Sequence, residues 1–386
     1  MLKALIFRDG EIYDPVPRGV GAVVIVDGKI AAVGALQVAS IERALASAQI
    51  EVEVVDARGC VLVPGLIDPH EHLLGSSGER GFSSRAPEIF CVELIAAGIT
   101  TVVGTLGTDN TMRTMAELLA KVKGLEEEGL TAFMYSGGYT LPPMTLMDSV
   151  RNDLLFISHV IGVGEVAVSD RRAVQPDARA LASVITEASV GGMLSRKAGI
   201  THIHVGEGKA RLAPVIEALD GFDLDPCSVY PTHVTRSPEL LREAAGLTRR
   251  GSFVDIDTTE RTLASDLRSF VEAGGDLARL TISTDAGGSS PHNLIEQLAS
   301  AVDEGWTLER VLPLATSNTA RVLQLSRKGR LASGADGDVV ALRAGALEPV
   351  FVAARGQLVM REGCVSKSPT FLAESNRTVI LNGHQN

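Results

Sequence analysis

Between Gly65 and about residue 325, short apolar runs alternate with longer segments whose apolar residues recur every three or four positions. The longer segments, such as 112–129 and 238–251, are typical of amphipathic helices, and a glycine closes each. Eight buried strands separated by helices are what a (β/α)₈ barrel requires, so we expect a TIM-like α/β fold. A doubly wound sheet shares the alternation, but no GxGxxG follows an early strand. The expected strands are LIDPH, ITTVVGT, TAFMYSGG, IGVGEVAV, ITHIHVG, VYPTHV, SFVDID and LTISTD.

The two ends of the chain differ from this central region. Residues 1–64 contain short β-rich runs broken by Gly, Pro and the pair Asp27-Gly28, which is a strong hairpin signal between apolar runs. Similar runs return from about residue 326. We therefore expect residues 1–64 and 326–386 to form a small β-sandwich domain, and residues 65–325 to form the metal-binding barrel.

Charge and composition exclude several classes of protein. A net charge of −11 over 386 residues argues against nucleic-acid binding, which needs a basic surface. No apolar run approaches the roughly 18 residues of a membrane span, and acidic residues interrupt the first residues before a signal-peptide core forms. The four cysteines form no CxxC pair and are expected to be reduced thiols. We expect a cytoplasmic protein.

Histidine and acidic side chains stand at or near the ends of five expected strands. In an extended strand, the two imidazoles of an HxH pair point to one face and can reach one ion. Single histidines and an aspartate end three later strands, where TIM-barrel active sites are built. An acid inside the apolar run IGVGEVAV would be costly if it were unpaired. These residues predict a divalent metal centre, and they are His70, His72, Glu165, His204, His233 and Asp285.

Two questions stay open: which of two histidines is a ligand, and which metal is bound. His202 shares a face with His204, so either could be the ligand. Zinc, manganese and iron all accept sites made of histidine and carboxylate, so the metal is not identified.

Longer motifs carry a more specific signal. Asp-x-His-x-His after an apolar strand, the later single histidines and the final Asp285 resemble the amidohydrolase superfamily, as do GKIAAVG and GRLASGADGDVV near the two ends. Within it the chain resembles the isoaspartyl dipeptidases along nearly its whole length. The stretches that carry this resemblance are GERGFSSRAPE, VVGTLGTD, YSGGYTLP, VSDRR, GGMLSRKAGITHIHVGEGK, PTHVTRS and STDAGGS.

The resemblance implies a role for each matching residue. His70 and His72 would hold one of two zinc ions, and His204 and His233 the other. Asp285 would be a ligand and the general base. The remaining matches are Tyr139 near the scissile carbonyl, Glu79 at the substrate amino group, and Arg172, Arg236, Thr108 and Ser289 around its carboxylates and backbone. The residue types fit these tasks, because arginine forks suit carboxylates and a tyrosine hydroxyl can donate to an oxyanion. Thr108 and Ser289 could instead cap turns, and Arg171 could replace Arg172 as the contact.

One position departs from the family. In the family, a carbamylated lysine normally bridges the two metals from the fourth strand. This chain has Glu165 there, in a segment that is one residue longer than the family's. Glutamate supplies the same charge and two oxygens from a shorter side chain. The backbone around Gly162 and Gly164 would therefore have to approach the metals more closely, which glycine permits.

The resulting hypothesis is a hydrolase that cleaves β-aspartyl (isoaspartyl) dipeptides with metal-activated water. An N-acyl amino acid or N-acetyl amino sugar deacetylase, or a cyclic amidase, on the same barrel is the alternative, which Glu165 favours and the pair of Arg172 and Arg236 disfavours. A third hypothesis is a non-catalytic scaffold that retained the fold. The resemblance further implies a homo-oligomer built of dimers, up to an octamer.

Overall fold

The computed structural model describes residues 3–259, 261–367, 369–376, 380–381 and 384–385. Its centre is a curled sheet of parallel strands, all at the expected places: β6 (Leu66–Glu71), β7 (Ile99–Gly104), β8 (Thr131–Ser136), β9 (Val160–Val168), β10 (Ile200–Val205), β11 (Val229–Thr232), β12 (Val254–Asp257) and β13 (Leu280–Ser283). Strands β6 to β11 are hydrogen-bonded in chain order, and β12 pairs with β13. Strand β12 lies beside β11, and β13 beside β6, where Glu71 and Ala286 form a parallel bridge. The strands thus follow one another around a TIM-like fold.

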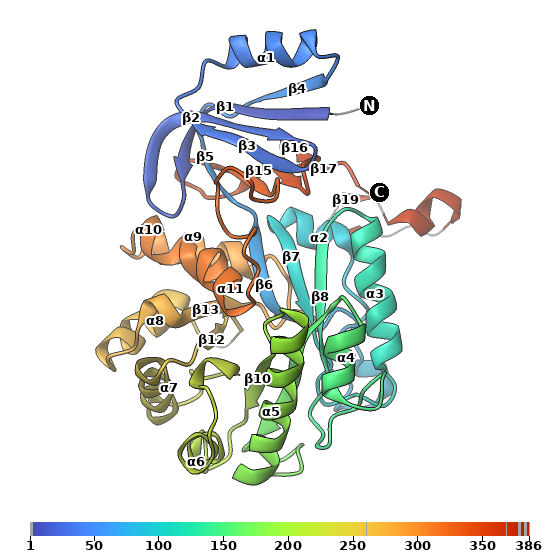
Figure 1. Cartoon of the computed structure of the whole chain (residues 1–386), viewed down its shortest axis with the longest axis vertical. Coiled ribbons are helices and arrows are strands. Elements are labelled where there is room, and N and C mark those ends of the chain that lie inside the picture. The colour runs from blue at the N-terminus through green and yellow to red at the C-terminus, as the bar shows by residue number, and fades with distance from the viewer. Residues whose placement is uncertain (1–2, 260, 368, 377–379, 382–383, 386) are drawn as a thin grey trace.

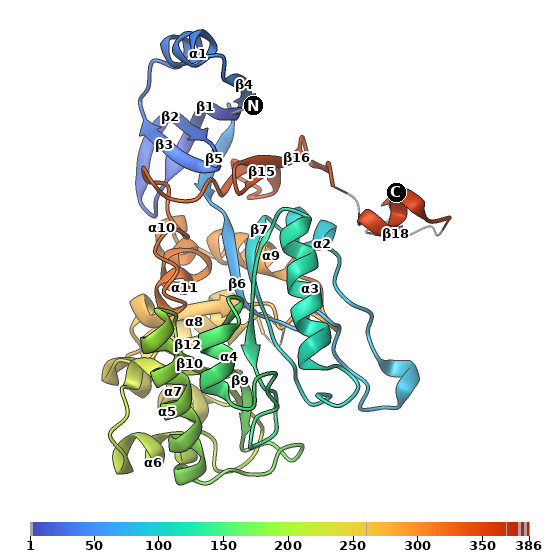
Figure 2. The ribbon, with the colours of Figure 1, turned by 45° about the vertical axis from the view of Figure 1, so that its right-hand side comes forward.

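Helices lie outside this sheet (Figures 1 and 2). Apolar side chains of the helices and strands pack together in one core. They are α2 (Cys91–Ala96), α3 (Met115–Glu127), α4 (Val150–Phe156), α5 (Ala178–Ser195), α6 (Ala213–Gly221), α7 (Pro238–Arg250), α8 (Leu263–Glu272), α9 (Asn293–Asp303), α10 (Leu308–Val311) and α11 (Ser317–Val322). Gly251 ends α7 in a left-handed conformation, as expected. Helix α3 begins three residues later than expected, because Thr114 and Glu117 form a capping box. None of the described helices combines the length and the apolar character needed to cross a membrane.

Both ends of the chain contribute to one nine-stranded sheet. Its strands are β1 (Lys3–Tyr13), β2 (Pro17–Val26), β3 (Lys29–Gly34), β4 (Glu51–Asp56), β5 (Cys60–Pro64), β14 (Val339–Arg343), β15 (Pro349–Ala354), β16 (Gln357–Arg361) and β17 (Cys364–Val365). The antiparallel pair β2 and β3 confirms the hairpin at Asp27-Gly28. Strands β5 and β14 join the two ends, with Val63 opposite Val340. Helix α1 (Val38–Ser47) was not expected among these strands. The arrangement as a sandwich and the domain boundaries stay predictions.

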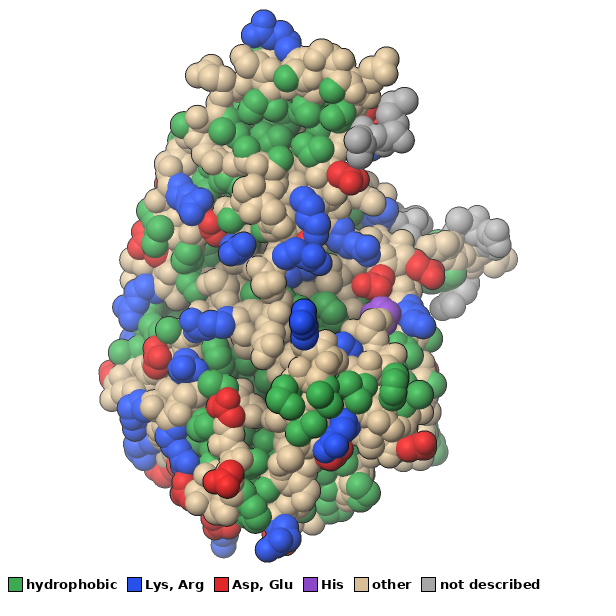
Figure 3. Space-filling model, in the orientation of Figure 1, with side chains coloured by type: hydrophobic (Ala, Val, Ile, Leu, Met, Phe, Trp, Pro, Cys, Tyr) green, Lys and Arg blue, Asp and Glu red, His purple; other side chains and the backbone are tan. Residues whose placement is uncertain are grey.

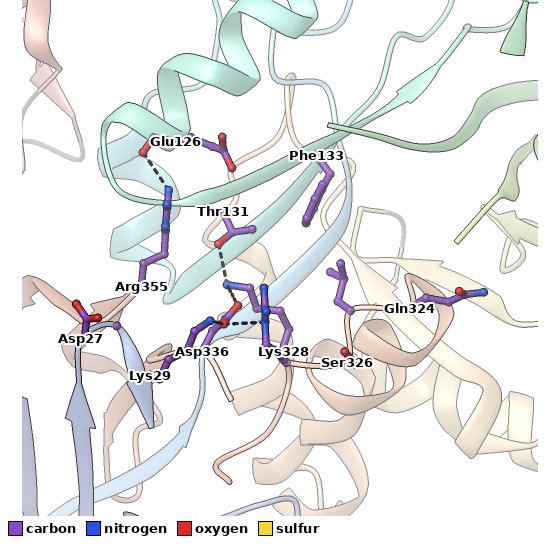
Figure 4. A pocket seen from close by; sticks show the side chains of 13 residues that line it. Asp27, Lys29, Glu126, Thr131, Phe133, Gln324, Ser326, Lys328, Asp336 and Arg355 are labelled. Atoms are coloured by element: carbon purple, nitrogen blue, oxygen red, sulfur yellow. Dashed lines mark hydrogen bonds and ion pairs between the residues drawn. The ribbon is translucent and has the colours of Figure 1, made fainter. Parts of the chain in front are cut away.

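Polar contacts hold this sheet against the barrel. Lys328 donates to Thr131 Oγ1 at 2.7 Å, and its amine lies 3.1 Å from Oδ2 of Asp336. Arg355 reaches the backbone carbonyl of Glu126 at 3.4 Å, beside a cavity of about 680 Å³ (Figure 4). Lys and Arg side chains gather across the middle of the face seen in Figure 3, over this boundary. Because acids already pair with the buried Lys328, we interpret the junction as structural.

Candidate metal centre

The six residues expected to hold metal converge inside the barrel. His70 lies at the end of β6, Glu165 in β9 and His204 in β10, and the other three follow strand ends directly or within two residues. All are buried except the Asp285 side chain, which is 24% exposed. His233 and Asp285 have positive φ angles of 59° and 47°, an uncommon backbone conformation that clusters at functional sites.

The carboxylate of Glu165 divides its two oxygens between two pairs of histidines. Its Oε2 lies 3.3 Å from Nε2 of His70 and 3.4 Å from Nε2 of His72. Its Oε1 lies 3.1 Å from Nδ1 of His204 and 3.4 Å from Nε2 of His233. Among the described residues, no arginine is paired with this carboxylate, so the structural ion pair that could explain a buried glutamate is absent there.

A β-bulge places Glu165 in this position. Between β9 and β10, Val163 pairs with Thr201 and Val166 with Ile203, so β9 contains one more residue than its partner. A bulge of this kind re-aims a side chain. The backbone is close to β10 here, since a Cβ on Gly164 would lie 2.8 Å from Cβ of His202. The structure thus shows one extra residue relative to β10 and a glycine packed closely against that strand. The length of the segment relative to the family's, and a closer approach of the backbone to the metals, stay predictions.

The donor atoms fit a divalent cation. Three groups have ligand atoms within 4.8 Å of one another: His70, His72 and Glu165; His70, His233 and Asp285; and Glu165, His204 and His233. Within the described part of the chain, His70 Nε2 and Glu165 Oε2 are buried without a hydrogen-bond partner. Buried polar atoms normally have partners, and imidazole and carboxylate are the ligands that zinc and related metals take. The set does not contain His202, whose Nδ1 lies 3.1 Å from the carbonyl oxygen of Tyr230.

Charge within the cluster fixes its protonation. Burial lowers the pKa of His70, but the charges of Glu165 and Asp285 outweigh it and raise this pKa to about 9. Burial raises the pKa of Glu165, yet His70, His204 and His233 together hold it well below its ordinary value. Burial lowers the pKa of His233, but the charge of Asp257 outweighs it and raises this pKa well above its ordinary value. His70 and His233 thus carry positive charge where a metal ion would otherwise balance the carboxylates.

Two further carboxylates orient the histidines, and neither was identified from the sequence. Oδ2 of Asp257 lies 2.8 Å from Nδ1 of His233, and Oδ2 of Asp170 lies 2.9 Å from Nε2 of His204. Carboxylates of this kind fix the ring orientation of metal-binding histidines. The only available signal was position, because Asp257 ends β12 and Asp170 follows β9 closely.

Tyr139 lies beside His204. Its Oη is 2.7 Å from Nδ1 of His204. Burial, followed by the charge of Glu165, raises the pKa of Tyr139 well above its ordinary value, so the phenol stays protonated and can donate a hydrogen bond.

A cavity of about 170 Å³ opens onto the metal centre and holds most of the expected substrate contacts. Glu79, Thr108, Arg172 and Arg236 line it. Arg171 lines the adjoining cavity instead. Ser289 lines neither; its hydroxyl donates to the carbonyl oxygens of Thr284 and Asp285 at 3.3 and 3.2 Å, as in a turn.

Two residues of opposite charge meet across the cavity. Nη1 of Arg172, after β9, lies 3.2 Å from Oε1 of Glu79, in the loop after β6. The other edge of the same guanidinium donates two hydrogen bonds to Asp170, from Nε to Oδ1 at 3.0 Å and from Nη2 to Oδ2 at 2.8 Å. Asp170 therefore holds the fork of Arg172 in place, and Glu79 occupies the edge that faces the cavity.

Comparison with known proteins places the chain in a family. The model of the amidohydrolase family matches residues 61–383. The chain belongs to the amidohydrolase family. Two crystal structures of the β-aspartyl dipeptidase from Fervidobacterium islandicum are similar over 94% of this chain and 98% of theirs. One is 35% identical with a TM-score of 0.88, and the other, a complex with β-Asp-Leu dipeptide, is 34% identical with a TM-score of 0.86. The resemblance inferred from the motifs is thereby confirmed, and the protein is an enzyme of the hydrolase class.

More distant relatives have other substrates in their names. A dihydroorotase from Pelotomaculum thermopropionicum is 27% identical over 90% of both chains. An imidazolonepropionase from Haloarcula marismortui is 31% identical, but the match covers only 34% of this chain and 31% of that enzyme. A D-hydantoinase structure, 19% identical with a TM-score of 0.64, shares the fold.

Proposed function

We propose that this protein hydrolyses β-aspartyl dipeptides at a two-metal centre, with zinc as the expected ion. The observation that carries the proposal is the contact between Glu79 and Arg172 at the mouth of the metal site. The isoaspartyl residue of such a dipeptide has a free amino group and a free carboxylate on one carbon atom. An amino acid head of this kind can insert between the two side chains, its ammonium facing Glu79 and its carboxylate facing Arg172.

The remaining residues would act on the scissile amide and the far end of the substrate. A divalent metal, when bound by the four histidines, Glu165 and Asp285, supplies Lewis acidity and makes a bound water easier to deprotonate. Asp285 would accept the proton, and the protonated Tyr139 would donate a hydrogen bond to the carbonyl oxygen as negative charge develops. Arg236, whose Nη1 donates to the carbonyl of Val205 at 2.7 Å, would pair with the second carboxylate of the dipeptide.

Paired substrates test the proposal. We expect the metal-replete enzyme to cleave β-Asp-Leu and to cleave its isomer α-Asp-Leu poorly, because only the β-linkage leaves both groups free on one carbon. Acetylation of the amino group should also lower kcat/KM by roughly 10- to 100-fold, since a hydrogen bond to a charged group contributes about 1.5–3 kcal/mol. Glu79→Gln should lose this discrimination between free and acetylated substrate.

The same screen decides between the proposal and its alternative. N-acetyl amino acids, N-acetyl amino sugars and cyclic amides such as dihydroorotate are included because the family contains enzymes named for cyclic substrates. Faster turnover of any of these than of β-Asp-Leu would replace the dipeptidase assignment. Arg236→Lys should weaken dipeptide hydrolysis although it keeps the charge, because the bidentate fork is lost.

A further inference from the structure

Arg113 makes an unusual set of contacts for a residue just before a helix. It is buried, precedes α3 and borders the cavity at the metal centre. Its guanidinium donates five hydrogen bonds, and an arginine has five N–H groups on that ion. The acceptors are the carbonyl oxygens of Leu74 (2.9 Å), Ser76 (2.8 Å), Ser77 (3.2 Å) and Ala86 (3.2 Å), and Oδ2 of Asp109 (3.2 Å).

These carbonyls stand at the two ends of one loop. Ser76 and Ala86 form the neck of the segment between β6 and α2, and the amide of Ala86 donates to the carbonyl of Ser76 at 3.0 Å. Nη2 of Arg113 contacts both carbonyls of this neck. Gly75 lets the two sides approach, since a Cβ there would lie 2.2 Å from the carbonyl oxygen of Ala86.

The tip of the loop is bonded mainly within itself, for example from the amide of Gly81 to the carbonyl of Gly78 at 3.0 Å and from the amide of Ser84 to the carbonyl of Gly81 at 2.9 Å. Phe82, at its far end, is 81% exposed. Glu79 lies between the neck and the tip and reaches Arg172 on the other side of the cavity. Nη2 of Arg85, at the end of the loop, also lies 3.5 Å from Oδ2 of Asp109. The position of Glu79 therefore depends on how firmly the base of the loop is held, by this ion pair and at the neck.

We propose that Arg113 is a positioning residue that clamps the neck of the loop 77–85 and so sets Glu79 at the place where it meets the substrate amino group. The role in substrate binding rests on the proposed function, while the clamp itself does not. Lysine cannot replace Arg113, because one ammonium has three donors and no planar fork to reach carbonyls on both sides of the neck.

Limited proteolysis measures the clamp without any substrate. Chymotrypsin should cleave the metal-replete enzyme after Phe82 roughly tenfold faster in Arg113→Lys and Arg113→Ala than in the wild type, because a looser neck opens the loop more often. Arg249→Ala is the matched control: Nη1 of Arg249 also donates to three carbonyls, those of Ala245, Ala273 and Gly274, away from this loop. It should leave cleavage at Phe82 unchanged.

Kinetics with β-Asp-Leu then test the link to Glu79. Arg113→Lys should raise KM roughly tenfold with a smaller change in kcat, as expected when an interaction remote from the reacting bond is loosened. In the background of Glu79→Gln, the same substitution should change KM little, because the two residues act through one contact.

The outcomes separate the two proposals. Wild-type cleavage rates in a folded, metal-loaded Arg113→Lys enzyme would overturn the clamp. Additive effects of Arg113→Lys and Glu79→Gln on KM would overturn the link between Arg113 and Glu79. If Arg113→Ala does not fold, Arg113→Lys decides. If the wild type does not hydrolyse β-aspartyl dipeptides, the proposed function fails, and the proteolysis result still supports or overturns the clamp.

Discussion

Oδ2 of Asp257 lies 2.8 Å from Nδ1 of His233, while Nε2 of the same ring faces Glu165. When metal is bound, this arrangement keeps a proton on Nδ1 and leaves Nε2 as the ligand atom. We predict that Asp257→Asn lowers the affinity of the site for metal by roughly 10- to 100-fold, the usual cost of losing such a partner. The metal content that remains after dialysis against a weak chelator measures this affinity. Asp276→Asn, at a turn remote from the site, is the control. Equal retention in both variants would show that Asp257 is only a structural residue.

Glu165 is predicted to bridge the two metal positions in place of a carbamylated lysine. Metal loading should then be independent of bicarbonate, and Glu165→Gln should weaken at least one site, because the charge that offsets the cations is lost. Elemental analysis of protein prepared with and without bicarbonate measures both effects. Glu165→Lys with added bicarbonate tests the family's usual bridge in this backbone. A full metal complement and normal turnover in Glu165→Ala would exclude the bridging role.

Asp285 is predicted to be the general base. Asp285→Asn keeps the shape of the side chain but cannot accept a proton, so kcat should fall by roughly 10²-fold or more. Metal content must be measured on the same sample, because Asp285 also belongs to the candidate ligand set. Its Oδ1 lies 3.0 Å from Nε2 of His72. Near-normal kcat in metal-loaded Asp285→Asn would assign the base elsewhere.

Metal binding is predicted to release protons. The pKa of His70 is raised from 6.5 to about 9 in the metal-free cluster, so the ring is protonated at pH 7.5 and must lose that proton to bind metal. Apparent metal affinity should therefore rise as the pH increases toward about 9. Calorimetric titration of the metal-free protein in buffers of different ionisation enthalpy counts the protons released. Heats that do not depend on the buffer would contradict a protonated His70.

The barrel strands and metal ligands could be predicted because each depends on a local pattern. Short apolar runs identify the strands, and a histidine or acid at a strand end must lie near the others once the strands are parallel. Spacing could not choose between His202 and His204, since both point to one face; only the cross-strand distances to Glu165 and Tyr230 separate them.

Other features depend on contacts that no local pattern encodes. Many acids stand near strand ends, and the selection of Asp257 and Asp170 as partners of histidines follows from distances across the sheet. Arg113 falls inside a segment that is helical by periodicity, and only the cap at Thr114 frees it for the loop. None of the residues of helix α1 is buried. The helix therefore lacks the buried apolar face that would distinguish it from the β-rich runs around it.

The pairing of β5 with β14 has a consequence for how the chain is made. During synthesis, β5 leaves the ribosome long before β14. The side chains of β5 are all buried in the finished protein, and the edge of β5 that pairs with β14 stays unpaired until these later residues are made. The barrel lies between them in the chain and can form first. A protein truncated before Val339 would keep an uncovered apolar strand edge, which is a template for aggregation. Such a copy would already contain all six candidate metal ligands, so what it lacks is the cover of β5 and not a part of the metal centre.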